Sequence, residues 1–124
     1  MTRRASARIL RNVTKYVPQE HDRVGAVAAA LASGRRRAVV TRLCGGPATT
    51  TELADHVGAA LPTMHQHLDV LRGAGLIHSA KDGRVVTHTV DLQPLEMMEE
   101  WIAVRRSFWT NQLDALSSAL EDRR

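Results

Sequence analysis

Several residue types are scarce in this chain, and each scarcity excludes a class of protein. With a single cysteine among 124 residues, no disulfide can form within the chain, which suits a reducing compartment. Aromatic residues make up 3% of the chain, so a core must be built from Ala, Val, Leu and Ile. No signal peptide and no apolar run of membrane length is present, so we expect a cytoplasmic protein.

The motifs of common enzyme classes are also missing. The sequence contains no glycine-rich phosphate loop and no serine nucleophile elbow. Its clustered acids Glu96, Glu99 and Glu100 lie where a helix is expected to begin, and there they suit the helix dipole. We therefore expect a protein without enzymatic activity and without a cofactor.

Positive charge is concentrated at the N-terminus. The net charge is +4, and residues 1–19 hold five basic residues and no acidic one, so the rest of the chain carries −1. Such an arm can bind phosphates along a minor groove. Alternatively, Ile9, Val13 and Val17 form the apolar stripe of a short helix that packs. Both interpretations stay open.

Two short amphipathic helices are expected in the middle of the chain. The apolar residues that share one face are Leu53, Ala54 and Val57 in the first helix, and Met64, Leu68 and Leu71 in the second. Thr49 and Glu52 have the spacing of a capping box at the start of the first helix. Gly58-Ala59-Ala60 is so short that it must turn the chain sharply. This pattern predicts a helix-turn-helix, whose second helix is shaped to enter a DNA major groove.

A basic hairpin is expected directly after these helices. The segment Val85–Val90 is β-branched at almost every position, and Asp82-Gly83 is predicted to be its two-residue turn. Lys81 and Arg84 flank this turn. Two cations at the tip of a rigid hairpin can reach phosphates beside the groove, as the wing of a winged helix does.

Four short segments then follow one another in a recognisable order. They are Ala30–Arg37 (ALASGRRR), Thr51–Ala54 (TELA), Gln66–Arg72 (QHLDVLR) and Ala74–Ile77 (AGLI). In this order they resemble the ArsR/SmtB family of winged-helix transcription regulators, and the resemblance covers most of the chain. It implies a mainly α fold with a small β-hairpin, namely a winged helix-turn-helix with N- and C-terminal dimerisation helices.

The chain is expected to have three parts. Residues 1–19 are a basic N-terminal arm or short helix, residues 20–92 are the winged helix-turn-helix DNA-binding core, and residues 93–124 are a C-terminal dimerisation helix. At 124 residues the chain is long enough for one domain with a modest core, which a dimer interface would help to stabilise.

Two scaffold helices are expected ahead of the helix-turn-helix. The first runs from His21 to Ser33 and the second from Arg35 to Cys44, ending at Gly45-Gly46-Pro47. Their predicted inward residues are Val24, Val27, Ala28 and Leu31 in the first, and Val39, Val40 and Leu43 in the second. We expect Cys44 to be a buried small hydrophobe. Arg35–Arg37 either touch phosphates or, as is more usual for such a run, face solvent.

Apolar residues recur at every third or fourth position of the C-terminal segment, which Pro94 is suited to begin. One domain face cannot cover so much apolar surface, so a partner helix is implied, unless the helix folds back on its own core. Three of the four aromatic residues lie here, which is typical of an interface. The predicted dimer-interface residues are Leu95, Met98, Trp101, Ile102, Phe108, Trp109, Leu113 and Leu116.

The recognition helix departs from the family pattern. Ala60 stands where the family usually has a capping Ser, and Asp69 where it often has Lys. We expect Thr63, His65 and Gln66 to read base edges. Asp69 either accepts from a cytosine amine or points away, and His67 is expected to be structural. The predicted DNA-binding residues are Leu61, Pro62, Thr63, His65, Gln66, Lys81 and Arg84.

The ligand residues of the family's known metal sites are missing from this sequence. Ala54 and His56 stand where arsenic- and cadmium-responsive members have cysteines, and residues 94–124 contain no His or Cys for the zinc type. With Asp82-Gly83 as the turn, His78 and His88 lie on opposite faces of the hairpin, whereas a three-residue loop would pair them. We therefore expect no metal site.

The sequence thus predicts a homodimeric repressor that binds double-stranded DNA at an inverted-repeat operator and occludes a promoter. Its effector is left open. The alternatives are a metal- or small-ligand-responsive sensor of the same family, and a winged helix used only for contacts with other proteins. Salt-dependent binding to DNA separates the first two from the third.

Overall fold

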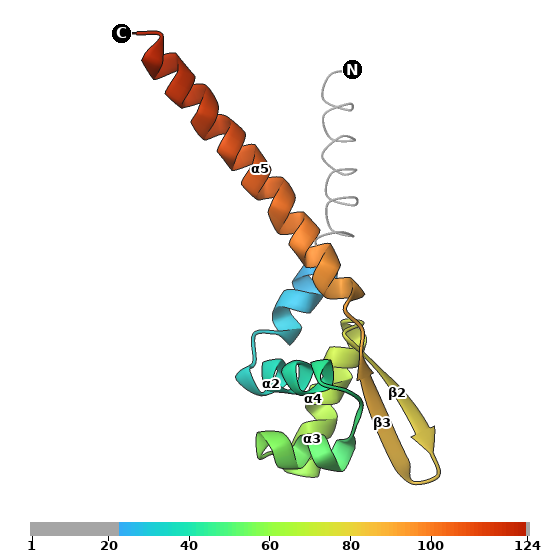
Figure 1. The fold of residues 1–124 in the computed structure, drawn as a ribbon. Helices are drawn as coiled ribbons and strands as arrows, with labels where there is room; N and C mark the ends of the chain where they lie inside the picture. The colour runs from blue at the N-terminus through green and yellow to red at the C-terminus, as the bar shows by residue number, and fades with distance from the viewer. Residues whose placement is uncertain (1–22, 124) are drawn as a thin grey trace, which may run out of the picture.

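The computed structural model describes residues 23–123, so the expected arm of residues 1–19 lies outside the described part. Helical residues 23–30 come first. They are followed by α2 (Gly34–Cys44), β1 (Ala48–Thr49), α3 (Thr50–Val57), α4 (Leu61–Gly73), β2 (Ile77–Asp82), β3 (Val85–Val90) and α5 (Gln93–Glu121). The hairpin of β2 and β3 projects from one side of the helices, and α5 extends away from them (Figure 1). This arrangement confirms the predicted winged helix-turn-helix.

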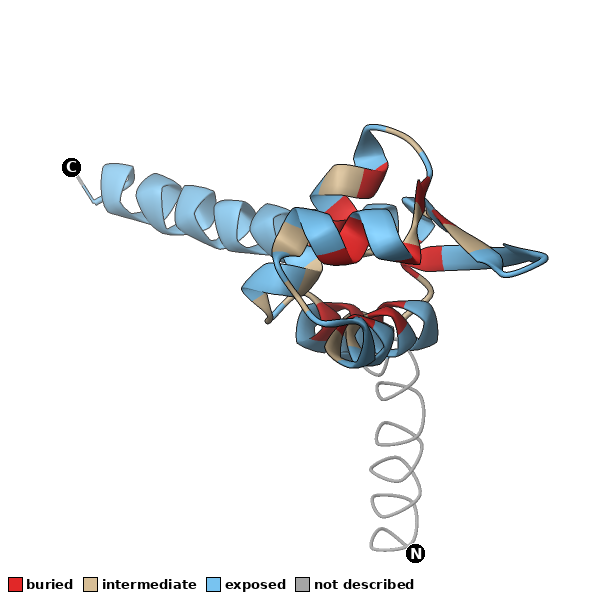
Figure 2. Ribbon diagram, turned by 90° about the horizontal axis from the view of Figure 1, so that it is seen from below, coloured by how far each residue is buried: buried red, intermediate tan, exposed pale blue. Residues whose placement is uncertain are grey.

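The core is aliphatic, as the scarcity of aromatic residues requires. Leu53 of α3 and Met64, Leu68 and Leu71 of α4 are at most 1% exposed, and the inward faces predicted for both helices are confirmed. Buried residues of the separate elements gather where the helices face one another (Figure 2). Each such side chain contributes roughly 1.5–3 kcal/mol by leaving water. This shared core fixes α4 relative to α3.

The scaffold ahead of α3 differs in part from the prediction. Val27 and Ala30 are buried in the first helix, whereas Ala28, predicted to face inward, is exposed. The prediction that Cys44 is buried is wrong, because it is exposed at the last position of α2, one step around the helix from buried Leu43. In the described chain, this helix turns its apolar face inward through Val39, Val40 and Leu43.

The arginine run at the start of α2 also has a role that the sequence did not show. Arg36 donates from Nε to the carbonyl of Ala30 at 2.7 Å and from Nη2 to that of Ala29 at 3.1 Å. Arg37 Nη1 donates to the carbonyl of Leu31 at 2.6 Å. These are carbonyls at the end of the first helix, which lack partners inside it. Arg36 and Arg37 therefore cap that helix. Arg35 and Arg37 are exposed, as the solvent-facing interpretation expects, whereas Arg36 is half-buried.

The two helices of the helix-turn-helix begin in different ways. The capping box predicted at α3 is confirmed, with Thr49 and Glu52 each bonding the backbone of the other. Gly58 ends α3 at φ 67°, a left-handed conformation that glycine adopts cheaply. At the start of α4, Ala60 has the extended backbone of an N-cap but no side chain that can bond the helix amides. The recognition helix therefore begins uncapped.

The sheet has three strands in the order β1-β3-β2, so the predicted two-stranded hairpin gains a short third strand. Asp82 pairs with Val85, which makes Gly83-Arg84 the two-residue turn and overturns the prediction of Asp82-Gly83. Gly83 has φ 61°, and no residue other than glycine has a positive φ in the described chain. A type II′ turn needs glycine at its first central position, so Gly83 fixes the turn one residue later than predicted.

Helix α5 has two parts with different surroundings. Leu95, Met97 and Met98 pack against the core of the domain. From Ile102 to the end of the described chain every residue is exposed, and this part of the helix stands clear of the body (Figure 2). Within residues 23–123 no helix combines the length and the apolar character needed to cross a membrane.

Candidate nucleic-acid interface

The outward face of α4 presents five of the predicted DNA-binding residues. Because Met64, Leu68 and Leu71 point into the core, Leu61, Pro62, His65 and Gln66 are exposed, and Thr63 is half-buried beside them. Leu61 is 47% exposed at the first position of the helix. These side chains include an imidazole and an amide that can bond base edges, together with apolar groups that can contact a thymine methyl.

The wing, which is the hairpin of β2 and β3, supplies the other two predicted DNA-binding residues. Arg84 lies within the turn rather than beside it, and Lys81 lies in β2 opposite Val86. Both are exposed. Arg84 is therefore held at the apex of the hairpin, where a cation can reach a phosphate outside the groove that α4 would enter.

A hollow of about 330 Å³ lies between the recognition helix and the wing. Leu61 and His65 line it from α4, Arg84, Val85 and Val86 line it from the wing, and Thr49–Thr51 line it from β1 and the start of α3. The structure therefore brings Leu61, His65 and Arg84 to one place, whereas Pro62, Thr63, Gln66 and Lys81 lie outside it. Thr51, exposed near the start of α3, also belongs to the hollow and was not predicted.

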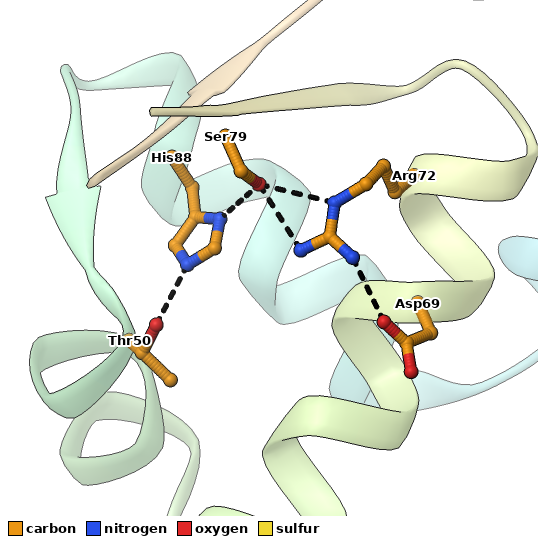
Figure 3. Close-up of polar contacts among 5 residues, drawn as sticks. All are labelled: Thr50, Asp69, Arg72, Ser79 and His88. Carbon is orange, nitrogen blue, oxygen red and sulfur yellow. Dashed lines mark hydrogen bonds and ion pairs between the residues drawn. The ribbon is translucent and has the colours of Figure 1, made fainter. Parts of the chain in front are cut away.

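A chain of hydrogen bonds joins the elements around this hollow (Figure 3). Arg72 of α4 donates from Nη1 to Asp69 Oδ1 at 2.8 Å, and from Nε and Nη2 to Ser79 Oγ of β2 at 3.2 and 3.1 Å. Ser79 Oγ is 2.7 Å from Nδ1 of His88 in β3. His88 Nε2 is 2.8 Å from Thr50 Oγ1 at the start of α3. Asp69 is thus held by Arg72.

His88 is the buried centre of this chain, at 1% exposure. Burial lowers the pKa of its imidazole, and the nearby charges of Arg72 and His65 lower it further. No role is predicted for Thr50, Ser79 or His88 from sequence alone. The one available signal was a histidine alternating with Val86 and Val90 along β3, which places its side chain on the inward face.

The remaining histidines do not form a cluster. His78 and His88 lie on opposite faces as predicted, although through a different register, since His78 pairs with Thr89 and His88 with Ser79. His78 Nε2 is 2.8 Å from Asp91 Oδ2, and Gln93 N donates to Asp91 Oδ1 at 2.9 Å. Both bonds lower the pKa of the Asp91 carboxyl, and the bond from the Gln93 amide has the larger effect. Within residues 23–123 no three His, Cys, Asp or Glu side chains gather as metal ligands, and the expectation of no metal site stays a prediction.

The predicted dimer-interface residues fall into two groups. Leu95 and Met98 are half-buried against the protein's own core, and Trp101 is half-buried with the Arg105 guanidinium 4.3 Å from the centre of its ring. The other five, all exposed, are Ile102, Phe108, Trp109, Leu113 and Leu116.

A three-helix core, a recognition helix with an exposed polar face and a basic hairpin beside it define a winged helix-turn-helix protein. Known proteins agree with this class. A family model described as a helix-turn-helix domain matches residues 31–80. The HTH-type transcriptional regulator Rv2034 of Mycobacterium tuberculosis is 33% identical over 92 residues, which are 74% of this chain and 83% of that protein.

Two further similarities narrow the class. The crystal structure of an ArsR family transcriptional regulator, RHA00566, superimposes with a TM-score of 0.69 at 37% identity, over 72% of this chain and 92% of that one. The transcriptional repressor SdpR of Bacillus subtilis is 25% identical over 59% of this chain and 81% of that protein. The chain therefore belongs to the ArsR family of transcriptional regulators. It is a DNA-binding transcription regulator of the winged helix-turn-helix type.

Proposed function

We propose that this protein is a cytoplasmic, homodimeric repressor that binds an inverted-repeat operator and occludes a promoter. The observation that carries the proposal is the hollow between α4 and the wing, where His65 and Arg84 face one space from two elements. In this arrangement α4 enters a major groove and the wing contacts the adjoining backbone. Thr63, His65 and Gln66 read bases, while Arg84 and Lys81 bind phosphates in any sequence.

The exposed stripe of α5 supports the homodimer. Phe108 is 66% and Trp109 63% exposed, and Leu113, Leu116 and Leu120 continue on the same helix. Nothing in the described part of the chain covers them, and such a patch marks an interaction site. A second copy is the proposed partner, because two α5 helices packed together bury the same stripe on both sides. Two-fold symmetry then places two recognition helices about 34–36 Å apart, in successive major grooves.

The name of a relative supports repression over activation, since SdpR is called a transcriptional repressor. Occlusion requires only that the bound protein overlaps the promoter, without a further contact with RNA polymerase. The alternative function is a winged helix that binds only other proteins. The experiment below tests this alternative together with the DNA-binding repressor.

The full-length chain should be used to select DNA from a random library, and binding of the winning sequence should be measured by fluorescence anisotropy at several salt concentrations. We expect an inverted repeat, an affinity at least about 10³-fold above that for random DNA, and a steep salt dependence. In transcription reactions the site should silence a promoter that it overlaps and spare one that lies far from it. No preferred sequence and no salt dependence would reject the proposal in favour of a protein-interaction module.

A further inference from the structure

Thr50 and His88 are the polar side chains buried among the described residues, and they bond each other. Placing polar groups in an aliphatic core is costly unless every donor and acceptor is paired. Here both ring nitrogens of His88 are paired, one with Ser79 and one with Thr50. The arrangement therefore depends on where the protons of the ring lie.

The neighbours of His88 decide that question. A guanidinium can only donate, so the two bonds from Arg72 occupy both lone pairs of Ser79 Oγ. Ser79 must then donate its own O–H to His88 Nδ1, which is an acceptor and carries no proton. The ring proton is consequently on Nε2, which donates to Thr50 Oγ1. The bonds run in one direction, from Arg72 through Ser79 and His88 to Thr50.

A second proton on His88 breaks this order. With Nδ1 protonated, the hydrogen of the ring and that of Ser79 point at each other. Ser79 can accept from Nδ1 only by giving up a bond from Arg72, and a second cation then lies near that guanidinium. Arg72 belongs to the recognition helix, Ser79 and His88 to the wing, and Thr50 to the start of α3. The neutral imidazole thus joins all three elements. The charged imidazole keeps its Nε2 bond to Thr50 but breaks the link through Ser79 to Arg72 of the recognition helix.

We propose that His88 is a positioning residue that holds the wing against the recognition helix in its neutral form only, so that operator binding weakens in acid. This inference rests on the proposed DNA-binding function. It concerns the geometry of the hollow lined by His65 and Arg84, since Thr50 and residues of the wing also line that hollow. His88 itself touches no DNA, because it is buried.

The groups around His88 favour its neutral form. The charged and titratable ones are Arg72 and His65 on α4, while β2 and α3 present the hydroxyls of Ser79 and Thr50. Burial and these two neighbours lower the pKa of His88 below the usual 6.5, so the neutral form prevails at neutral pH. His65 is a second histidine on the proposed DNA-facing surface, so the experiment removes it with His65→Gln.

The first experiment needs no DNA. Nitrogen NMR of the histidine side chains in the full-length protein at about pH 7.5 should show His88 with Nδ1 unprotonated and Nε2 protonated. The opposite tautomer would reverse the direction of the hydrogen bonds and overturn the inference. Ser79→Ala should shift the Nδ1 resonance, whereas Ser79→Thr, which keeps the hydroxyl, should leave it near its original position.

The second experiment measures affinity for the selected DNA in the His65→Gln background at constant ionic strength. Between about pH 7.5 and about pH 5 the Kd should rise at least about fivefold, and with His88→Gln it should change less than about twofold. At pH 7.5 Ser79→Ala should weaken binding and Ser79→Thr should restore it. These two variants change an exposed position, so they keep the test valid if His88→Gln does not fold.

The outcomes separate the two proposals. If the parent chain, with His65 intact, binds no DNA at any pH, the proposed function fails. If it binds specific DNA but the pH profile is the same with and without His88, or if Ser79→Ala binds like the parent, only the positioning role of His88 is wrong.

Discussion

Arg36 of α2 meets His67 of the recognition helix, with Arg36 Nη1 3.4 Å from His67 Nδ1. Because arginine only donates, Nδ1 is the acceptor and the ring proton is on Nε2. That nitrogen is buried and has no hydrogen-bond partner among the described residues. Burial, and then Arg36 and Arg35, lower the pKa of His67. The recognition helix therefore packs on the scaffold through a neutral imidazole with one unsatisfied donor.

This contact predicts how stability depends on pH. His67 and His88 both have a lowered pKa in the folded protein, so the unfolded chain binds more protons once the pH falls below about 6.5. The free energy of unfolding should be constant above that pH and decrease below it. His67→Leu should reduce this slope and, by removing the unpaired donor, raise stability by about 1 kcal/mol at neutral pH.

Urea unfolding at about pH 7.5 and about pH 5.5 measures both effects. His56→Gln, which removes an exposed histidine from α3, serves as the control. If His67→Leu lowers stability by more than about 1 kcal/mol and keeps the wild-type slope, the account of His67 is wrong.

The uncapped start of α4 predicts a stabilising substitution. Ala60 has φ −68° and ψ 153°, the backbone that an N-cap requires. Ala60→Ser should therefore raise the free energy of unfolding by about 1 kcal/mol, because its hydroxyl can accept from an amide of the first turn. Thr49→Ala, which removes the existing cap of α3, should lower it by a similar amount. Thermal unfolding of the three proteins without DNA checks this, and equal melting temperatures would contradict it.

The interface predicts two kinds of DNA-binding defect. Gln66→Ala should relax the preference for one base pair and cost about 1–3 kcal/mol on the operator alone. Arg84→Ala should weaken operator and random DNA alike and reduce the slope of log Kd against log salt by about one unit per protomer. Arg123→Ala, which removes the same charge at the far end of the chain, is the control. Equal losses on both DNAs for both variants would reject this division of roles.

The α5 stripe predicts the effect of charge on assembly. Trp109→Lys combined with Leu113→Lys should give monomers in sedimentation experiments and much weaker operator binding, because a dimer holds two half-sites at once. Ser107→Lys combined with Asn111→Lys adds the same charge at the same spacing on the other side of the helix. That control should remain dimeric. A wild-type chain that sediments only as a monomer at about 10 μM would show that α5 does not pair two copies.

Local rules predicted much of the fold. The capping box of Thr49 and the inward faces of α3 and α4 depend on residues a few positions apart, and the structure confirms them. The turn was misplaced because Asp-Gly and Gly-Arg are both acceptable turn dipeptides, and only the pairing of Asp82 with Val85 decides between them. Because the turn lies one residue later than predicted, Arg84 is within the turn and not beside it.

The candidate site was only partly predictable for a related reason. Exposure of His65 and Gln66 follows from the helical period of α4. The role of His88 depends on partners 9 and 38 residues away, and that of Arg36 on carbonyls exposed by the end of another helix. No spacing rule in the sequence connects such groups, because they meet only through the packing of separate elements.

The exposed part of α5 has a thermodynamic consequence. Helix formation in an isolated segment depends on its length and on temperature, and most helices in proteins owe their stability to packing of an apolar face. The 29 residues of α5 have such packing only near Leu95, Met97 and Met98. If a second copy supplies the packing for the rest of α5, helix content measured by circular dichroism will rise with protein concentration. Folding of the last turns of α5 and assembly of the dimer will then be coupled in a single equilibrium. The cellular amount of the protein would then set how much of α5 is formed.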